Sequence, residues 1–175
     1  MSSTTSDSIR VAGIVNDSIV DGPGLRITIF MQGCLRNCPG CHNPEAMDMA
    51  GGQEYTVEEL FEKIQANPLL DGVTFSGGEP LLQAKVLVPL ARRIKEAGLS
   101  LAVYTGDTLE GILMRGDKDT LALLGYVDTL IDGPFLLAER SLALSFRGSG
   151  NQRVLDVKKS LEAGVPVEDE CWGRR

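Results

Sequence analysis

The sequence predicts an α/β fold in which a mostly parallel sheet forms a partial (β/α) barrel or an open curved sheet within a single domain. Short apolar runs alternate along the chain with segments of helical spacing, a pattern typical of βαβ units. The chain has 175 residues, which suffices for one core but falls short of the roughly 250 residues of a complete eightfold barrel. We expect residues 1–10 to form a flexible N-terminal tail, residues 11–160 the folded domain and residues 161–175 a C-terminal tail.

The first expected strand covers residues 25–31, an apolar run with glycines on both sides. Thr56 and Glu59 have the spacing of a capping box, which predicts the start of an amphipathic helix. The remaining expected elements, in chain order, are a strand over residues 73–75, a helix over 87–94 that ends before Gly98, a strand over 99–104, a helical segment over 109–124 broken around Gly116, and a strand over 126–131.

Charge and composition exclude several classes of protein. The formal net charge of -7 is the opposite of the basic footprint of a nucleic-acid-binding protein. No apolar run approaches the roughly 20 residues that span a membrane, and the first eight residues lack the pattern of a secretory signal. We therefore expect a cytoplasmic protein with neither nucleic acid nor membrane as a partner.

The cysteines are the most informative residues of the chain. Cys34, Cys38 and Cys41 lie within eight residues in the pattern C-x3-C-x2-C, whereas Cys171 lies near the C-terminus. Three soft ligands in a short loop suit an iron-sulfur cluster or zinc. A structural zinc ion needs four ligands, and the only histidine, His42, directly follows Cys41, which makes joint ligation of one ion difficult. A four-iron cluster accepts three thiolates and leaves one iron open; a zinc site that includes Cys171, or three unlinked thiols, remain the alternatives.

Four unusual turns follow the expected strands. They are the cysteine loop, the glycine turn at residues 77–79, and the turns at residues 104–106 and 132–134. The carboxyl ends of parallel strands meet at one edge of a sheet, where ligands bind in α/β proteins. A glycine turn with an acidic residue is by itself also typical of an ordinary strand-to-helix connection. Together with the cysteine loop, it indicates a single active site.

These segments resemble a known family of enzymes. The cysteine loop, the segment Asp-Gly-Pro-Gly-Leu-Arg at residues 21–26 and the segment Ser-Gly-Gly-Glu-Pro at residues 76–80 are similar to motifs of the radical S-adenosylmethionine superfamily. Within it, the chain most resembles the glycyl radical enzyme activases that serve anaerobic (class III) ribonucleotide reductase. Residues 38–41, 132–135 and 146–152 carry the narrower match, and the similarity runs from about residue 12 to about residue 155.

The resemblance implies an oxidoreductase with two cofactors. Cys34, Cys38 and Cys41 would ligate a 4Fe-4S cluster and be catalytic, and the open iron would bind the amino and carboxylate groups of S-adenosylmethionine. An electron from the reduced cluster would cleave this cofactor to methionine and a 5'-deoxyadenosyl radical, which removes hydrogen from a glycine of the partner. The implied partners are the large subunit of anaerobic ribonucleotide reductase and a low-potential electron donor.

The resemblance also implies which residues contact S-adenosylmethionine. Glycines without a β-carbon would let the backbone approach the cofactor, and Glu79 would offer a negative charge to its ammonium group. His42 is expected beside the adenine or the sulfonium, although a packing role is the common alternative for such a residue. The expected cofactor contacts are Gly40, Cys41, His42, Gly77, Gly78 and Glu79.

Three other functions remain open at this point. The residues after Asn43 depart from the reductase-activase pattern, and the Cys-His-Asn triplet at residues 41–43 also occurs in pyruvate formate-lyase activating enzymes. An electron-transfer module without catalytic activity would hold a fully ligated cluster, with Cys171 as its fourth ligand. A radical enzyme that acts on a small molecule such as a pterin is disfavoured only by the narrower resemblance.

Overall fold

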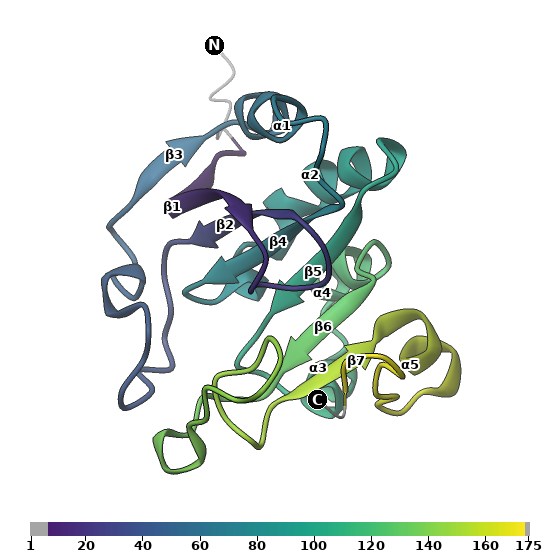
Figure 1. The fold of residues 1–175 in the computed structure, drawn as a ribbon. Helices are drawn as coiled ribbons and strands as arrows, with labels where there is room; N and C mark the ends of the chain where they lie inside the picture. The colour runs from purple at the N-terminus through teal and green to yellow at the C-terminus, as the bar shows by residue number, and fades with distance from the viewer. Residues whose placement is uncertain (1–6, 174–175) are drawn as a thin grey trace.

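A computed structural model describes residues 7–173 of the chain. Seven strands form one open mixed sheet in the order β3-β1-β2-β4-β5-β6-β7, and its four central strands, β2, β4, β5 and β6, are parallel (Figure 1). This arrangement confirms the α/β prediction. Of the two predicted forms, a partial barrel or an open sheet, the structure has the open sheet. The strands are β1 (Ile9–Ser18), β2 (Arg26–Met31), β3 (Gln53–Tyr55), β4 (Gly72–Gly77), β5 (Ser100–Tyr104), β6 (Thr129–Asp132) and β7 (Arg153–Asp156).

Several of the helices lie behind the sheet in the view of Figure 1. The capping box predicted for Thr56 and Glu59 is present, because each residue hydrogen-bonds the backbone N–H of the other. The expected break at Gly116 is also present, since this glycine ends one helix with a φ of 60°. The helices are α1 (Val57–Gln65), α2 (Ala84–Glu96), α3 (Leu109–Arg115), α4 (Lys118–Leu124) and α5 (Val157–Ala163), with 3-10 turns at Pro44–Ala46, Pro80–Gln83 and Leu137–Glu139.

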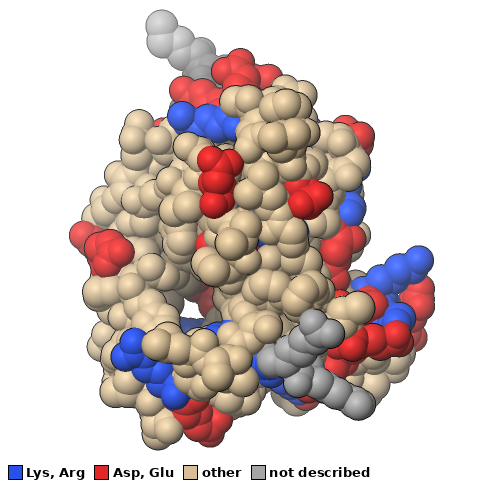
Figure 2. All heavy atoms as spheres, in the orientation of Figure 1, with Lys and Arg blue, Asp and Glu red and all other residues tan. Residues whose placement is uncertain are grey.

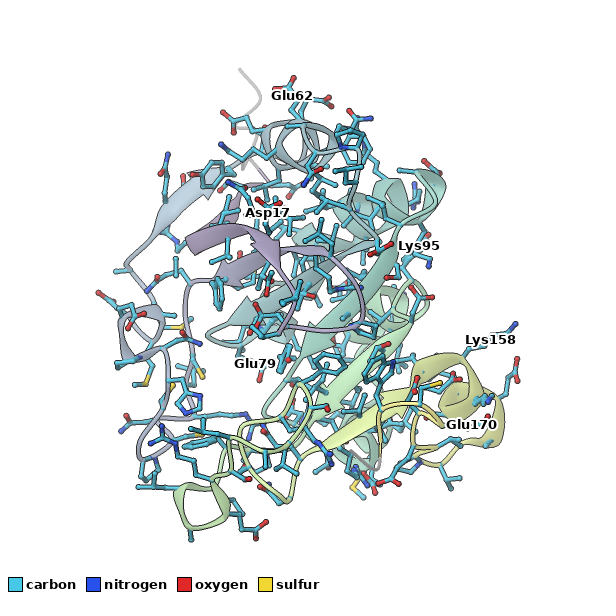
Figure 3. All side chains as sticks on the ribbon, viewed as in Figure 1. Asp17, Glu62, Glu79, Lys95, Lys158 and Glu170 are labelled. Carbon is cyan, nitrogen blue, oxygen red and sulfur yellow. The ribbon has the colours of Figure 1, made fainter. Side chains whose placement is uncertain are left out.

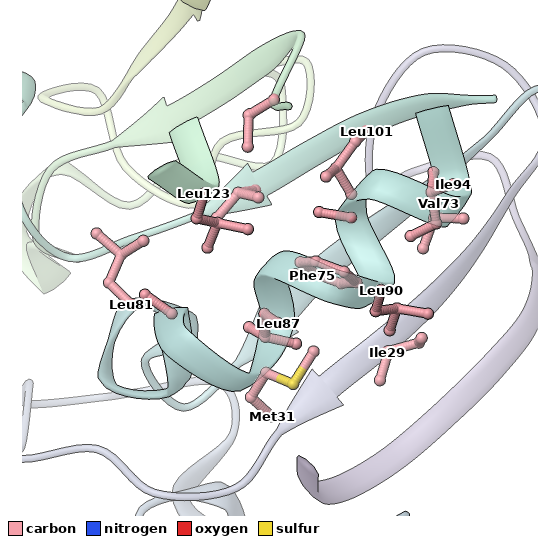
Figure 4. Close-up of a cluster of buried hydrophobic side chains, with 14 of the residues drawn as sticks. Ile29, Met31, Val73, Phe75, Leu81, Leu87, Leu90, Ile94, Leu101 and Leu123 are labelled. Carbon is pink, nitrogen blue, oxygen red and sulfur yellow. The ribbon is translucent and has the colours of Figure 1, made fainter. Parts of the chain in front are cut away.

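The apolar core lies between the sheet and α2 (Figure 4). Leu87, Leu90 and Ile94 recur at helical spacing on α2 and are fully buried. Phe75 of β4 is fully buried within the same cluster. Burial of this apolar face is the main favourable contribution to folding.

A loop covers the opposite face of the sheet. Residues 19–25 pass in front of β4 in Figure 1. The Asp21 carboxylate accepts hydrogen bonds from the hydroxyls of Ser18 (2.6 Å) and Thr28 (3.0 Å), and the Thr74 hydroxyl donates to the Asp21 carbonyl (2.7 Å). Polar side chains of β2 and β4 therefore hold this loop in place, whereas their apolar neighbours point to the helices.

The structure differs from the sequence expectations at both ends of the domain. β1 begins at Ile9, inside the segment expected to be a tail, and pairs with both β2 and β3. At the other end, α5 runs through Ala163, and the Asp169 N–H donates to the Val154 carbonyl at 2.9 Å. Residues beyond 160 therefore pack against β7. Residues 1–6 and 174–175 of the expected tails lie outside the described residues.

The strand expected over residues 126–131 begins only at Thr129. The N–H groups of Tyr126 and Val127 instead donate to the carbonyls of Leu123 and Leu124, which extends the turn after α4. None of the helices within residues 7–173 combines the length and apolar character needed to cross a membrane.

Candidate functional site

A pocket of about 160 Å³ opens at the carboxyl ends of the parallel strands. All four turns singled out in the sequence contribute to its lining, so the structure brings them together as expected. Figure 2 shows basic and acidic side chains interspersed on the visible face of the molecule. The lining residues that the sequence identified are Cys34, Cys38, Cys41, His42, Gly77, Gly78 and Glu79.

The cysteine loop is held by backbone and side-chain hydrogen bonds. The N–H of Gly33, which has a φ of 103°, donates to the Ala46 carbonyl at 2.7 Å. The Gln32 side-chain amide donates to the carbonyls of Glu45 (3.0 Å) and Asp48 (2.8 Å). Both ends of the loop are therefore fixed to each other, and the thiols between them lie in the pocket.

The three thiols are free and half-buried. Burial raises the pKa of Cys34, and a hydrogen bond from the backbone N–H of Arg36 opposes this effect. The Asn43 N–H lies 3.4 Å from the Cys41 sulfur. Bound iron deprotonates thiols, and N–H donors directed at the sulfurs stabilise the resulting thiolates.

The glycine turn makes room for the protein's own backbone. A β-carbon on Gly77, whose φ is 98°, would lie 2.4 Å from the Met31 nitrogen, and one on Gly78 would lie 2.3 Å from the Gly33 carbonyl oxygen. These glycines allow the end of β4 to pack closely against the start of the cysteine loop. Their contact with a cofactor stays a prediction.

Glu79 is 5% exposed and lies beside the end of β4 (Figure 3). Its carboxylate accepts hydrogen bonds from the N–H groups of Leu81 (3.2 Å) and Gly106 (2.9 Å), and Arg36 Nε lies 3.6 Å away. The carboxylate expected to receive the cofactor ammonium is therefore already hydrogen-bonded within the chain. It contributes negative charge to the pocket wall, and its contact with an ammonium group stays a prediction.

His42 and Gly40 differ in their position. The His42 ring lies 4.8 Å from the Phe135 ring, and both residues line the pocket. Gly40 is not among the lining residues; a β-carbon there would lie 2.9 Å from Leu137. Its φ of 74° fits a turn that must accommodate this leucine.

Sequence reasoning missed one charged residue and gave another residue no individual role. Arg36 lines the pocket from within the cysteine loop, and its place between Cys34 and Cys38 was the available signal. Phe135 lines it as well, although the sequence analysis named it only as part of a family motif. Hydrophobic periodicity does not predict that either residue lines the pocket.

The donor set fits a cluster held by three thiolates. Among residues 7–173, no three His, Cys, Asp or Glu side chains are placed to hold one metal ion. Cys171 is exposed and lies outside the lining of the pocket. This placement disfavours a structural zinc site that includes Cys171, and it leaves three cysteines in the lining of one pocket.

Comparisons with known proteins agree with this donor set. Residues 20–155 match the family described as 4Fe-4S single cluster domain. The anaerobic ribonucleoside-triphosphate reductase-activating protein of Vibrio cholerae is 35% identical over 144 residues, which cover 77% of this chain and 89% of that protein. The protein of the same name from Haemophilus influenzae is 34% identical with the same coverage.

Two further proteins are similar over smaller regions or at lower identity. The pyruvate formate-lyase-activating enzyme of Clostridium pasteurianum is 46% identical over 101 residues, which are 55% of this chain and only 42% of that enzyme. The crystal structure of QueE from Escherichia coli aligns with 71% of both chains at 18% identity and a TM-score of 0.48. By its family match and its nearly full-length relatives, the chain belongs to the 4Fe-4S single cluster domain family, among the radical S-adenosylmethionine activases of glycyl radical enzymes.

Proposed function

We propose that this protein activates anaerobic ribonucleoside-triphosphate reductase by installing a glycyl radical on its large subunit. One observation carries the proposal: three cysteines face a glycine turn in a pocket, in a chain that spans 89% of the reductase-activating proteins it matches. When bound, the cluster and S-adenosylmethionine would supply a one-electron cleavage that ends in removal of a hydrogen atom from the partner's glycine.

The chain's own residues bind and orient the reactants. Cys34, Cys38 and Cys41 would hold the cluster, and the turns at the ends of β4, β5 and β6 would form the wall against which S-adenosylmethionine binds. The rings of His42 and Phe135 contact each other and contribute an aromatic part of this wall.

A second loop, residues 141–149, contributes Gly148 to the lining of the pocket. The Tyr104 hydroxyl donates a hydrogen bond to the Phe146 carbonyl at 2.5 Å, and Phe146 has a φ of 62°. The ring of Phe146 lies 4.9 Å from that of Trp172. These contacts attach the segment 141–149 to the end of β5 and to Trp172, and they position Gly148 in the pocket lining.

The proposed partners are the large subunit of the reductase and a low-potential electron donor. Three free thiols suit a reducing compartment, and we place the reaction in the cytoplasm. Pyruvate formate-lyase is the second candidate target, because the 46% identity over 101 residues exceeds the identity to the reductase-activating proteins. Against it, those residues are 42% of that activating enzyme.

The test combines the reconstituted protein with each candidate target in turn. The protein is loaded anaerobically with iron and sulfide and mixed with S-adenosylmethionine, a reductant and either the reductase or pyruvate formate-lyase. We expect 5'-deoxyadenosine and a glycyl-type doublet in the electron paramagnetic resonance spectrum of the reductase only. A doublet on pyruvate formate-lyase alone would reassign the target. If a reduced cluster forms but no 5'-deoxyadenosine appears, the activase proposal is wrong.

A further inference from the structure

Four charged side chains connect the cysteine loop to the rest of the pocket. The charge cluster consists of Arg36, Glu79, Asp107 and Arg115. The Arg36 guanidinium forms an ion pair with Asp107, and its Nε lies 3.6 Å from Glu79. Arg115 donates to the other oxygen of the Asp107 carboxylate at 2.5 Å. The positive charges of the two guanidinium groups therefore balance the negative charges of the two carboxylates.

The position of Arg36 is fixed by packing as well as by charge. A β-carbon on Gly106 would lie 2.3 Å from Arg36 Cδ, so the arginine stem rests directly on the Gly106 backbone. The Gly106 N–H donates to Glu79 at 2.9 Å, on the side that faces the guanidinium. The segment between Cys34 and Cys38 is thereby attached to the loop after β5.

Arg36 differs from Arg115 in what it faces. Arg36 is the only Lys or Arg among the described residues that line the pocket, and its side chain is 33% exposed. Arg115 is 53% exposed and does not line the pocket. Both pair with Asp107, so the two arginines share a partner, but only Arg36 lines the pocket together with the cysteines.

A 4Fe-4S cluster bound by three thiolates carries negative charge, and its reduction adds one more negative charge. A cation fixed in the same pocket lowers the energy of the reduced form relative to the oxidised form. Without Arg36, the nearly buried Glu79 carboxylate would lose its only ion-pair partner in the charge cluster. The loss would leave negative charge next to the cluster and oppose its reduction.

We propose that Arg36 is a positioning residue that attaches the Cys34–Cys38 segment to Asp107 and favours the reduced cluster. This inference rests on the proposed cluster but not on the identity of the partner enzyme. It concerns one electron delivered from dithionite to the cluster, with no bond formed or broken. It can therefore be tested without the reductase.

The experiment measures the midpoint potential of the reconstituted cluster by redox titration followed by electron paramagnetic resonance. At a fixed potential, Arg36→Gln is expected to lower the ratio of reduced to oxidised cluster about tenfold. Arg36→Lys retains the charge and is expected to recover most of this loss. Arg115→Gln removes the same charge from the same partner and is the matched control, with little change expected.

Iron content and melting temperature separate this role from general destabilisation. The positioning role is supported if Arg36→Gln takes up less iron than Arg115→Gln while the iron-free proteins have equal melting temperatures. In that case, the potential of the cluster in Arg36→Lys tests the effect of the charge. A fully loaded Arg36→Gln protein with an unchanged potential would overturn the proposal. Equal shifts in Arg36→Gln and Arg115→Gln would overturn it too. Failure of the wild-type protein to form any cluster would instead refute the proposed function.

Discussion

The two faces of the central strands have opposite chemical character. On the helix-covered face, Ile29, Val73 and Phe75 are fully buried within the apolar core. On the loop-covered face, Thr28 and Thr74 alternate with these residues along the same strands and hydrogen-bond the segment 19–25. Alternation along a strand thus assigns one face to stability and the other to holding loops.

The two faces therefore contribute differently: one stabilises the fold, and the other positions the loops. The helix-covered face gains stability from apolar area removed from water. The loop-covered face uses directional hydrogen bonds, which add little net stability but fix the positions of loops. Substitutions on the two faces should therefore have distinguishable effects.

The largest effect is expected in the cysteine loop. Cys38→Ala removes one of the three thiols of the pocket and should abolish cluster retention and 5'-deoxyadenosine formation, while the far-ultraviolet circular dichroism stays unchanged. Cys171→Ala is the matched control, because this thiol is exposed and outside the pocket. Iron analysis of both proteins checks the prediction. Loss of iron in Cys171→Ala would indicate a fourth protein ligand and contradict the open-iron account.

The second-largest effect is expected from a substitution in the apolar core on the helix-covered face. Phe75→Ala leaves a cavity among fully buried side chains and should lower the free energy of unfolding by about 3–5 kcal/mol. Urea denaturation of the iron-free protein measures this loss in the free energy of unfolding. Phe75→Leu keeps most of the volume and is expected to lose less. Equal losses would show that the residue does not pack as the structure indicates.

On the loop-covered face, Arg26 is 1% exposed. Its guanidinium donates to the carbonyls of Pro23 (2.7 Å), Val73 (2.8 Å) and Ser100 (3.1 Å) and to the Thr74 hydroxyl (2.8 Å). Burial lowers the pKa of Arg26 to about 10, so the side chain is still charged at neutral pH.

Arg26→Met would remove the guanidinium donor from these buried acceptors and should cost about 2–3 kcal/mol of unfolding free energy. Its distinguishing effect should be faster proteolysis within residues 19–25, which Phe75→Ala would not produce in the native state. Limited proteolysis with mass spectrometry identifies the cleavage site. Cleavage spread evenly over the chain in both variants would contradict a local anchoring role.

The smallest effect concerns a surface pair at the far edge of the sheet. A hydrogen bond from Arg153 lowers the pKa of Glu110 from 4.5 to about 2. Because the folded-state pKa is depressed, the pair stabilises the protein above about pH 4.5, and this contribution disappears as the pH falls toward 2.

The Glu110 side chain is 53% exposed, so Glu110→Gln should cost less than about 1 kcal/mol at pH 7. The difference from wild type in urea denaturation should shrink between pH 4.5 and pH 2.5. A difference that stays constant over this range would show that the ion pair is not its cause.

Local signals were sufficient for much of the fold. The capping box at Thr56 and Glu59 and the helix end at Gly116 depend on residues a few positions apart, and both are present. β1 was missed because it pairs with strands that the chain reaches only later: Ile9 lies opposite Tyr55. A strand of this kind acquires its structure from distant partners, and single-sequence patterns do not contain those partners.

The site could be predicted as a set of turns but not as a set of contacts. Parallel strands bring their carboxyl ends together, so the cysteine loop and the glycine turn had to meet. The hydrogen bond from Gly106 to Glu79 joins residues 27 positions apart and depends on the packing of two turns. For the same reason, no sequence pattern predicted that Arg36 would occupy the space beside Gly106.

The central claim is that three cysteines hold a cluster with one iron open to S-adenosylmethionine. The most direct measurement is the electron paramagnetic resonance spectrum of the reduced, reconstituted protein before and after addition of S-adenosylmethionine. We predict that the signal changes in shape and g-values on addition, and that Cys171→Ala behaves like wild type. An identical spectrum in both conditions, from a protein with a full complement of iron, would show that no iron is open and would contradict the claim.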